Sequence, residues 1–153
     1  MNNVANKTIW DNIKYFNPEE FADPNYPGSG KLIHLPLVIK LDHLRTVIKR
    51  PCITHWKVGG CVDVKGEHGH AEQSFHRLDM GAMACDFHFD CNILPREQYY
   101  YVEREGFGGI GVYYDWHWDG KLLSIGFHVD MRQLASIQRW VHRDDEYSYL
   151  LGR

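Results

Sequence analysis

The sequence predicts an α+β fold with a small, mostly antiparallel sheet and flanking helices, and three observations support this. Segments with a helical repeat of apolar residues are interspersed with segments in which apolar residues alternate. The pair Asp119-Gly120 is typical of the tight turn that joins two antiparallel strands. The 153 residues are 44% hydrophobic and 24% charged, which indicates one globular domain over residues 1–153.

The first half of the chain has one strong helix signal and one strand signal. Asn17 and Pro18 favour a short helix start, since Asn caps helices and Pro suits the first helical position. Apolar residues recur every three or four positions from Leu37 to Ile48, and Pro51 prevents the helix from continuing. The expected elements are a helix start at 17–21, a loop at 23–30, a helix at 35–49, a strand at 52–56 and a long Gly-rich loop at 57–73.

The second half carries the sheet. Apolar side chains alternate with polar ones from Met83 to Asp90, so one face of this strand carries Asp86 and His88. Pro95 and Gly106 mark the start and end of a second helix. The expected elements are a strand at 83–90, a helix at 95–105, a hairpin at 109–130 and a short helix at 132–140.

Composition excludes several classes of protein. A net charge of −3 argues against a nucleic-acid-binding protein, whose surface is basic. No apolar run approaches the roughly 20 residues of a membrane span. Residues 1–6 lack the pattern of a secretory signal, so synthesis in the cytoplasm is expected. The four cysteines form no C-x-x-C pair and are expected to be reduced, with Cys85 a core residue.

Histidine is the unusual feature of the composition, with ten in the chain. His76 ends the long loop, Asp86 lies on the following strand and His128 lies on the last strand of the hairpin. Two imidazoles and a carboxylate can hold zinc tetrahedrally and leave one position open, as catalytic sites do. The spacing alone is equally compatible with a solvated loop histidine, a capping carboxylate and a half-buried strand histidine.

Several short motifs together resemble the zinc D-alanyl-D-alanine carboxypeptidase family of peptidoglycan peptidases, in its short, often phage-encoded branch. The matching motifs are Tyr15-Phe16 with Glu20-Phe21, Leu41-Asp42-His43-Leu44-Arg45, Ser74-x-His76, Ala84-x-Asp86, Gly109-Ile110-Gly111 and Phe127-His128-Val129-Asp130-x-Arg132. The resemblance runs from Tyr15 to about Trp140. It implies the hedgehog/DD-peptidase fold and a zinc-dependent peptidase that hydrolyses stem peptides or cross-links of peptidoglycan at the cell wall.

Carried over by position, the resemblance makes His76, Asp86 and His128 the zinc ligands and places the hydroxyl of Ser74 near the substrate. The sequence departs from the family because Asp86 lies ten positions after His76, whereas the family spacing is seven. His70 or His68 is therefore a rival first ligand.

The general base is not fixed by the resemblance, because Ile125 stands where many members carry Glu. Asp130 is the first candidate, since it shares a strand face with His128. It could equally orient a ligand imidazole or pair with Arg132. His117 and His88 are further candidates.

Substrate recognition also departs from the family. Lys57 stands near the position of the arginine that binds the substrate carboxylate, and it lacks the two-pronged geometry of a guanidinium. Two alternatives to the peptidase follow: a zinc-binding structural or wall-binding module without catalysis, for example in a phage tail, and a histidine-rich domain without zinc. The oligomeric state is not indicated by the sequence.

Overall fold

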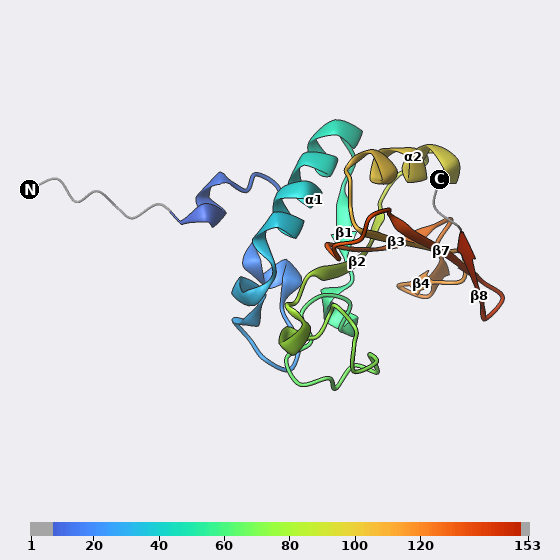
Figure 1. Cartoon of the computed structure of the whole chain (residues 1–153). Helices are drawn as coiled ribbons and strands as arrows, with labels where there is room; N and C mark the ends of the chain where they lie inside the picture. Colours follow the sequence, from blue (N-terminus) through green and yellow to red (C-terminus); the bar gives the residue numbers. More distant parts are fainter. Residues whose placement is uncertain (1–7, 151–153) are drawn as a thin grey trace, which may run out of the picture.

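The structure is a computed structural model that describes residues 8–150 (Figure 1). The amino-terminal residues 1–6, expected to lack a secretory signal, lie outside the described residues. The fold is α+β, as the sequence predicts. The helices are α1 (Leu35–Ile48) and α2 (Pro95–Arg104), with 3-10 turns at Ile9–Asn12, Pro18–Phe21, Ser29–Leu32, Trp56–Val58 and Leu78–Met80.

Six strands form the main sheet in the order β1-β2-β6-β3-β7-β8. All neighbouring pairs are antiparallel except β3 and β7. A separate small hairpin consists of β4 and β5. The strands are β1 (Cys52–Thr54), β2 (Ala84–Phe89), β3 (Gly109–Tyr113), β4 (His117–Trp118), β5 (Lys121–Leu122), β6 (Gly126–Asp130), β7 (Gln138–Arg143) and β8 (Glu146–Leu150).

The helix expected at 35–49 is confirmed as α1. Its apolar repeat is buried against the sheet, and Leu37, Leu41 and Leu44 are fully buried. The helix ends at Ile48, because the next residue, Lys49, has a left-handed φ of 56° that cannot continue an α-helix. The helix expected at 95–105 is confirmed as α2, followed by Gly106 at a φ of 79°.

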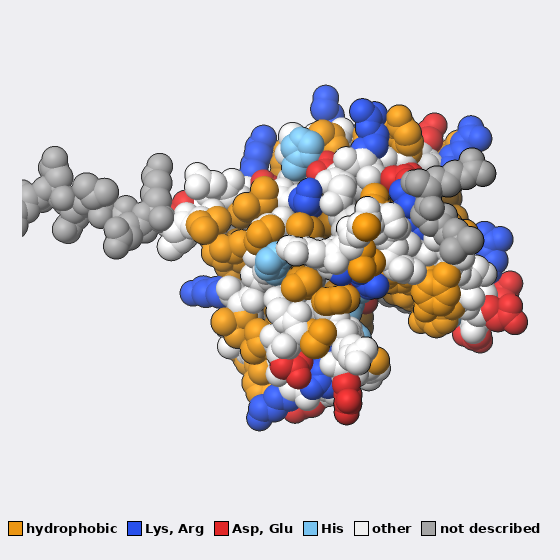
Figure 2. Space-filling view, in the orientation of Figure 1, with side chains coloured by type: hydrophobic (Ala, Val, Ile, Leu, Met, Phe, Trp, Pro, Cys, Tyr) orange, Lys and Arg blue, Asp and Glu red, His pale blue; other side chains and the backbone are white. Residues whose placement is uncertain are grey.

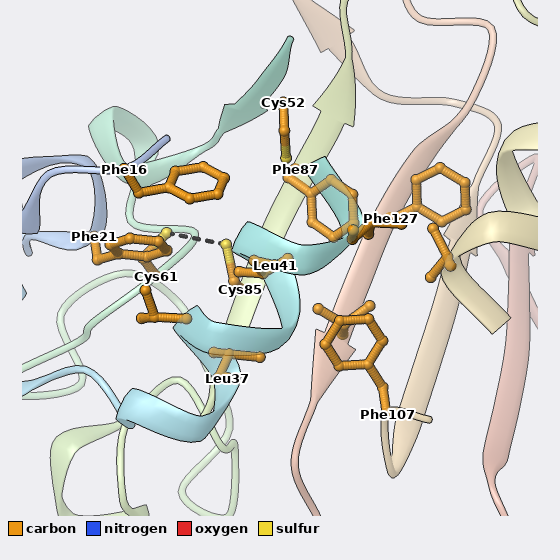
Figure 3. Packing of buried hydrophobic residues seen from close by; sticks show 14 of the residues in the cluster. Phe16, Phe21, Leu37, Leu41, Cys52, Cys61, Cys85, Phe87, Phe107 and Phe127 are labelled. Atoms are coloured by element: carbon orange, nitrogen blue, oxygen red, sulfur yellow. Dashed lines mark hydrogen bonds between the residues drawn. The ribbon is translucent and has the colours of Figure 1, made fainter. Parts of the chain in front are cut away.

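The two faces of the sheet have different chemistry. On β2 and β6 the apolar side chains Cys85, Phe87, Phe127 and Val129 belong to the core that the helices cover (Figure 3). Because successive side chains on a strand point to opposite faces, Asp86 and His128 share the other face. The sheet is therefore the boundary between an apolar core and a polar site.

Two expectations for the last third of the chain need correction. The helix expected at 132–140 is wrong, because residues 138–143 form β7, which pairs with β3 and is followed by β8. The turn between β7 and β8 contains Asp144 and Asp145, both at positive φ. The hairpin expected at 109–130 is confirmed in part. Its two outer strands, β3 and β6, pair in antiparallel fashion, but Asp119-Gly120 forms the turn of the smaller hairpin β4–β5 between them.

Within residues 8–150, neither helix has the length and apolarity needed to cross a bilayer. On the face seen in Figure 2, Lys and Arg side chains lie scattered among acidic and apolar ones.

Candidate metal centre

The sheet register brings two of the expected ligands together. Asp86 on β2 lies directly opposite His128 on β6, and their side chains point to the same face. The third, His76, comes from the chain segment just before the 3-10 turn Leu78–Met80. Its backbone N–H lies 3.4 Å from the hydroxyl oxygen of Ser74, which accepts the bond.

The ligand atoms of these three residues converge on one point. Nε2 of His76 lies 3.1 Å from Nδ1 of His128 and 3.2 Å from Oδ1 of Asp86. Nδ1 of His128 lies 3.0 Å from the same carboxylate oxygen. The three atoms thus form a nearly equilateral triangle at the side of a pocket.

The outer nitrogen of each imidazole faces an oxygen atom that accepts a hydrogen bond. Nδ1 of His76 lies 3.1 Å from the backbone carbonyl of Cys61, and Nε2 of His128 lies 2.9 Å from Oδ2 of Asp130. Because these acceptors require an N–H, the neutral rings carry their protons on the outer nitrogens. The inner nitrogens are left with lone pairs that face each other, an arrangement that needs a cation or a shared proton between them.

Burial and neighbouring charges shift the pKa values of two members of the triangle, Asp86 and His128. Burial opposes the charged form of Asp86, yet the two imidazoles hold the pKa of its carboxyl well below the usual range. Burial also lowers the pKa of His128, but hydrogen bonds and charges from Asp130 and Asp86 outweigh it and raise that pKa to about 9. Without metal, a proton on His128 therefore neutralises part of the negative charge.

The geometry fits a tetrahedral zinc ion. With bonds of about 2.0–2.2 Å to nitrogen and oxygen, neighbouring ligand atoms of a tetrahedron are separated by about 3.3 Å. The observed separations are 3.0, 3.1 and 3.2 Å. Two imidazoles and one carboxylate also match the ligand types that zinc takes in catalytic sites, and they leave a fourth position toward the pocket.

His70 lies against this triangle but is placed differently. Its ring stacks on that of His76 with centroids 4.3 Å apart and planes within 10°. An imidazole lone pair lies in the ring plane, so two stacked rings cannot both direct their lone pairs at one ion. The structure therefore favours His76 over His70 as the ligand, although one ring atom of His70 lies within 4.8 Å of the ligand atoms of His76 and Asp86.

A carboxylate fixes the orientation of His70. Its Nδ1 lies 2.8 Å from Oδ2 of Asp63, which is fully buried. The other carboxylate oxygen of Asp63 accepts the backbone N–H groups of Gly66 and Glu67. Burial and the neighbouring His76 lower the pKa of His70, so this ring is neutral near pH 7.

The pocket beside the triangle has a volume of about 640 Å³. Its walls combine imidazoles, aromatic rings and one guanidinium, contributed by His70, Gln73, Ser74, Phe75, His76, Met80, Asp86, Tyr113, His128, Arg132 and Trp140. Trp140 donates its indole N–H to the hydroxyl of Tyr113 at 3.1 Å. Each of the two rings therefore has a polar partner, and both rings form part of the pocket wall.

Gly111 makes room for this wall. It lies opposite His128 on one side and Trp140 on the other. A Cβ atom at position 111 would lie 2.4 Å from the indole nitrogen of Trp140, which is too close for any contact between heavy atoms. The glycine thus lets the indole pack beside the His128 ring, at 5.2 Å between centroids.

Arg132 is the lining residue with a permanent positive charge. Its Nε lies 2.8 Å from Oδ1 of Asp130 and its Nη2 lies 2.6 Å from Oδ2. The guanidinium lies between the rings of Phe75 and Trp140, at 4.9 and 5.2 Å from their centroids. Since the Asp130 carboxylate takes only the Nε–Nη2 edge, the Nη1–Nη2 edge remains available for a second anion.

Asp130 lies behind His128 and away from the pocket. Its side chain is fully buried, and both oxygens already accept hydrogen bonds from Arg132 and His128. These partners hold the pKa of Asp130 well below its usual range although burial opposes ionisation. This geometry favours the orienting role over that of a general base.

Other sequence candidates are not brought to this pocket. Lys57 lies in the turn Trp56–Val58 and lines a different pocket with Glu20 and Asp119. His88 bonds Nε2 of His55 through its Nδ1 at 2.8 Å, and His117 is exposed on β4. Ser74 lines the pocket.

Sequence reasoning missed four contributors. The sequence indicates Arg132 only as a partner of Asp130. It lies two residues after Asp130, just beyond the end of β6, and lines the pocket. Asp63 and the carbonyl of Cys61 come from the long loop, and no periodicity in that loop indicates which side chains turn inward. Trp140 was missed because residues 132–140 were expected to be helical.

Comparisons of the chain with protein-family models, with curated proteins and with solved structures give no match.

Proposed function

We propose that the protein is a zinc-dependent peptidase that hydrolyses peptide bonds in the stem peptides or cross-links of peptidoglycan. The observation that carries the proposal is the convergence of His76, Asp86 and His128 at an open pocket, with the inner lone pairs unprotonated in the neutral rings. The motifs that resemble the D-alanyl-D-alanine carboxypeptidase family supply the substrate class and the hedgehog/DD-peptidase fold. A metallopeptidase on that fold needs this donor set and this open side.

His76, Asp86 and His128 would hold the zinc ion. When bound, zinc supplies Lewis acidity, which polarises a carbonyl group and lowers the pKa of a water molecule. Asp130 and the carbonyl of Cys61 keep the two imidazoles in the tautomer that can bind a metal. These contacts make the ligand set rigid before any substrate binds.

His70 is the residue that we assign to proton transfer in place of Asp130. It lines the pocket, and Asp63 engages its Nδ1, so Nε2 is left as the acceptor. A carboxylate that orients a neutral imidazole is the arrangement that general bases use in other hydrolases. The ring is also close enough to the ligand triangle to reach a water molecule at the open side.

Arg132 is the residue that we assign to substrate binding in place of Lys57. Its free edge can bind a carboxylate with two parallel hydrogen bonds, and stem peptides carry free carboxylates. Phe75 and Trp140 fix the guanidinium plane. A substrate with a carboxylate one residue from the scissile bond would therefore be preferred over the corresponding amide.

The proposed place of action is the cell wall, reached after synthesis in the cytoplasm. A phage lytic enzyme or a virion-borne wall hydrolase acts in this way.

Digestion of purified peptidoglycan tests the proposal. Zinc-loaded wild-type protein is expected to release new amino and carboxyl termini, identified by mass spectrometry of the soluble fragments. His76→Ala and His128→Ala are expected to be inactive, while His43→Ala, which alters a histidine on α1 that pairs with Glu105 outside the pocket, keeps the activity. Absence of any cleavage at saturating zinc, across walls with different cross-links, would refute the peptidase.

The second candidate is a zinc-binding module without catalysis, such as a wall-binding or phage-tail component. It is favoured by Ile125, which is buried in the core and cannot carry a proton where many family members have Glu. Zinc binding together with sedimentation on peptidoglycan, but without turnover, would support this candidate over the peptidase.

A further inference from the structure

Two thiols are in contact in the core below the metal centre. The Sγ atoms of Cys61 and Cys85 lie 3.5 Å apart, and both residues are fully buried (Figure 3). Their neighbours in the core include Phe21, Leu37 and Leu41. The separation is that of two thiols in contact, and a disulfide would shorten it to about 2.05 Å.

A backbone hydrogen bond joins the two segments that carry the cysteines. The N–H of Asp86 donates to the carbonyl of Gly60 at 2.7 Å, and each of these residues is the direct neighbour of one of the cysteines. With the sulfur atoms 3.5 Å apart, an approach of about 1.5 Å brings them to the bond length of a disulfide.

Both cysteines also lie next to residues of the metal centre. The carbonyl of Cys61 accepts the Nδ1 proton of the ligand His76, and Cys85 directly precedes the ligand Asp86. The chain between the two cysteines includes His70 and Ser74. A covalent link here would close the loop that presents the pocket and would fix two ligands relative to each other.

We propose that Cys61 and Cys85 form a disulfide when the chain folds in an oxidising medium and remain free thiols in a reducing one. A small disulfide such as oxidised glutathione is the oxidant. One protein thiolate attacks it and releases one molecule of glutathione, and the second protein thiolate then displaces the other. The two protein thiols are oxidised, the small disulfide is reduced to two thiols, and the protons pass to the departing thiolates. The inference does not depend on the peptidase activity.

The burial of the sulfur atoms determines when the bond can form. Because neither thiol is reachable from solvent, we expect exchange during folding rather than in the folded protein. Once formed, the bond is shielded from reductants until the protein unfolds. The closed loop has fewer unfolded conformations, so the oxidised protein should unfold at a higher urea concentration than the reduced one.

Refolding from urea in a mixture of oxidised and reduced glutathione, with dithiothreitol as the reducing control, tests the inference. Free thiols are then alkylated, and the digested protein is analysed by mass spectrometry. The expected result is a Cys61–Cys85 link with Cys52 and Cys91 alkylated, and a raised urea midpoint. The double variant Cys52→Ala, Cys91→Ala should form the same link, whereas Cys85→Ala should lose it.

Two results would overturn the inference. One is alkylation of all four cysteines after refolding in oxidised glutathione. The other is a link that joins Cys61 or Cys85 to a different cysteine in the wild-type protein. Since the double variant keeps both thiols of the pair and contains no other cysteine, failure of that variant to form a link would also count against it.

Discussion

Replacing Asp130 with Asn tests how the sheet prepares His128 for metal binding. In the wild type, Oδ2 of Asp130 accepts hydrogen bonds from Nε2 of His128 at 2.9 Å and from Nη2 of Arg132 at 2.6 Å. Asn offers one oxygen and one NH2 group, so it cannot accept on both sides of the site. If the oxygen stays with Arg132, the NH2 group faces the His128 nitrogen and favours the tautomer that directs its proton at the metal.

The magnitude follows from two opposing effects. Loss of a partner that orients a ligand typically weakens metal binding by about 10–100-fold, or about 1.4–2.8 kcal/mol. However, Asp130 also helps to raise the pKa of His128 to about 9, so at pH 7 the wild type must displace a bound proton to take up zinc. That displacement costs about 100-fold in apparent affinity at pH 7 and disappears above the pKa. The variant has a lower pKa at His128 and avoids part of this cost.

We therefore expect Asp130→Asn to bind zinc about 10–100-fold more weakly at pH 9, with a smaller difference from the wild type at pH 7. Competition with a chromophoric chelator at both pH values measures the two affinities. Asp42→Asn is the matched control, because Asp42 accepts the backbone N–H groups of Lys14 and Tyr15 outside the pocket and should not alter zinc binding. Equal zinc affinities of wild type and Asp130→Asn at pH 9 would refute the reasoning.

The structure makes three further predictions, each for stability measured by urea denaturation. Gly111→Ala should destabilise the fold by about 1–3 kcal/mol because the added methyl group overlaps Trp140, and an unchanged midpoint would contradict that packing. Phe127→Ala should cost about 3–5 kcal/mol because the ring is fully buried in the core, and a cost below 1 kcal/mol would show that it is not. Burial opposes ionisation of Asp23 and Asp63, but backbone N–H groups and histidines hold both pKa values below the usual 3.8. Metal-free protein should therefore keep this stabilisation above pH 4 and lose it progressively at lower pH, with a weaker pH dependence in Asp23→Asn.

Much of the fold follows from local sequence patterns. The apolar repeat of α1 and the alternation along β2 each reflect a local rule, and the structure agrees with both. The local pattern is weaker at residues 132–140, where the sequence predicts a short helix, whereas residues 138–143 form β7. Their strand conformation depends on pairing with β3, a contact between segments far apart in sequence.

The candidate site was predictable in its residue types and not in their roles. His76, Asp86 and His128 are brought together by strand register and by a loop, and the motifs that resemble the peptidase family select them. The role of Asp130 depends on which imidazole nitrogen it contacts, and spacing along a strand does not give that. Lys57 is predicted from its position along the chain, whereas Arg132 lies two residues beyond the end of β6 and lines the pocket while it is paired with Asp130.

The metal content of the purified protein tests the central claim most directly. Elemental mass spectrometry should find one zinc ion per chain after loading and desalting. His76→Ala, Asp86→Ala and His128→Ala should each lose it, while His43→Ala, which alters a histidine on α1 that pairs with Glu105, retains it. The account would be contradicted if the wild-type protein held no zinc after loading and desalting, or if all three ligand variants retained it.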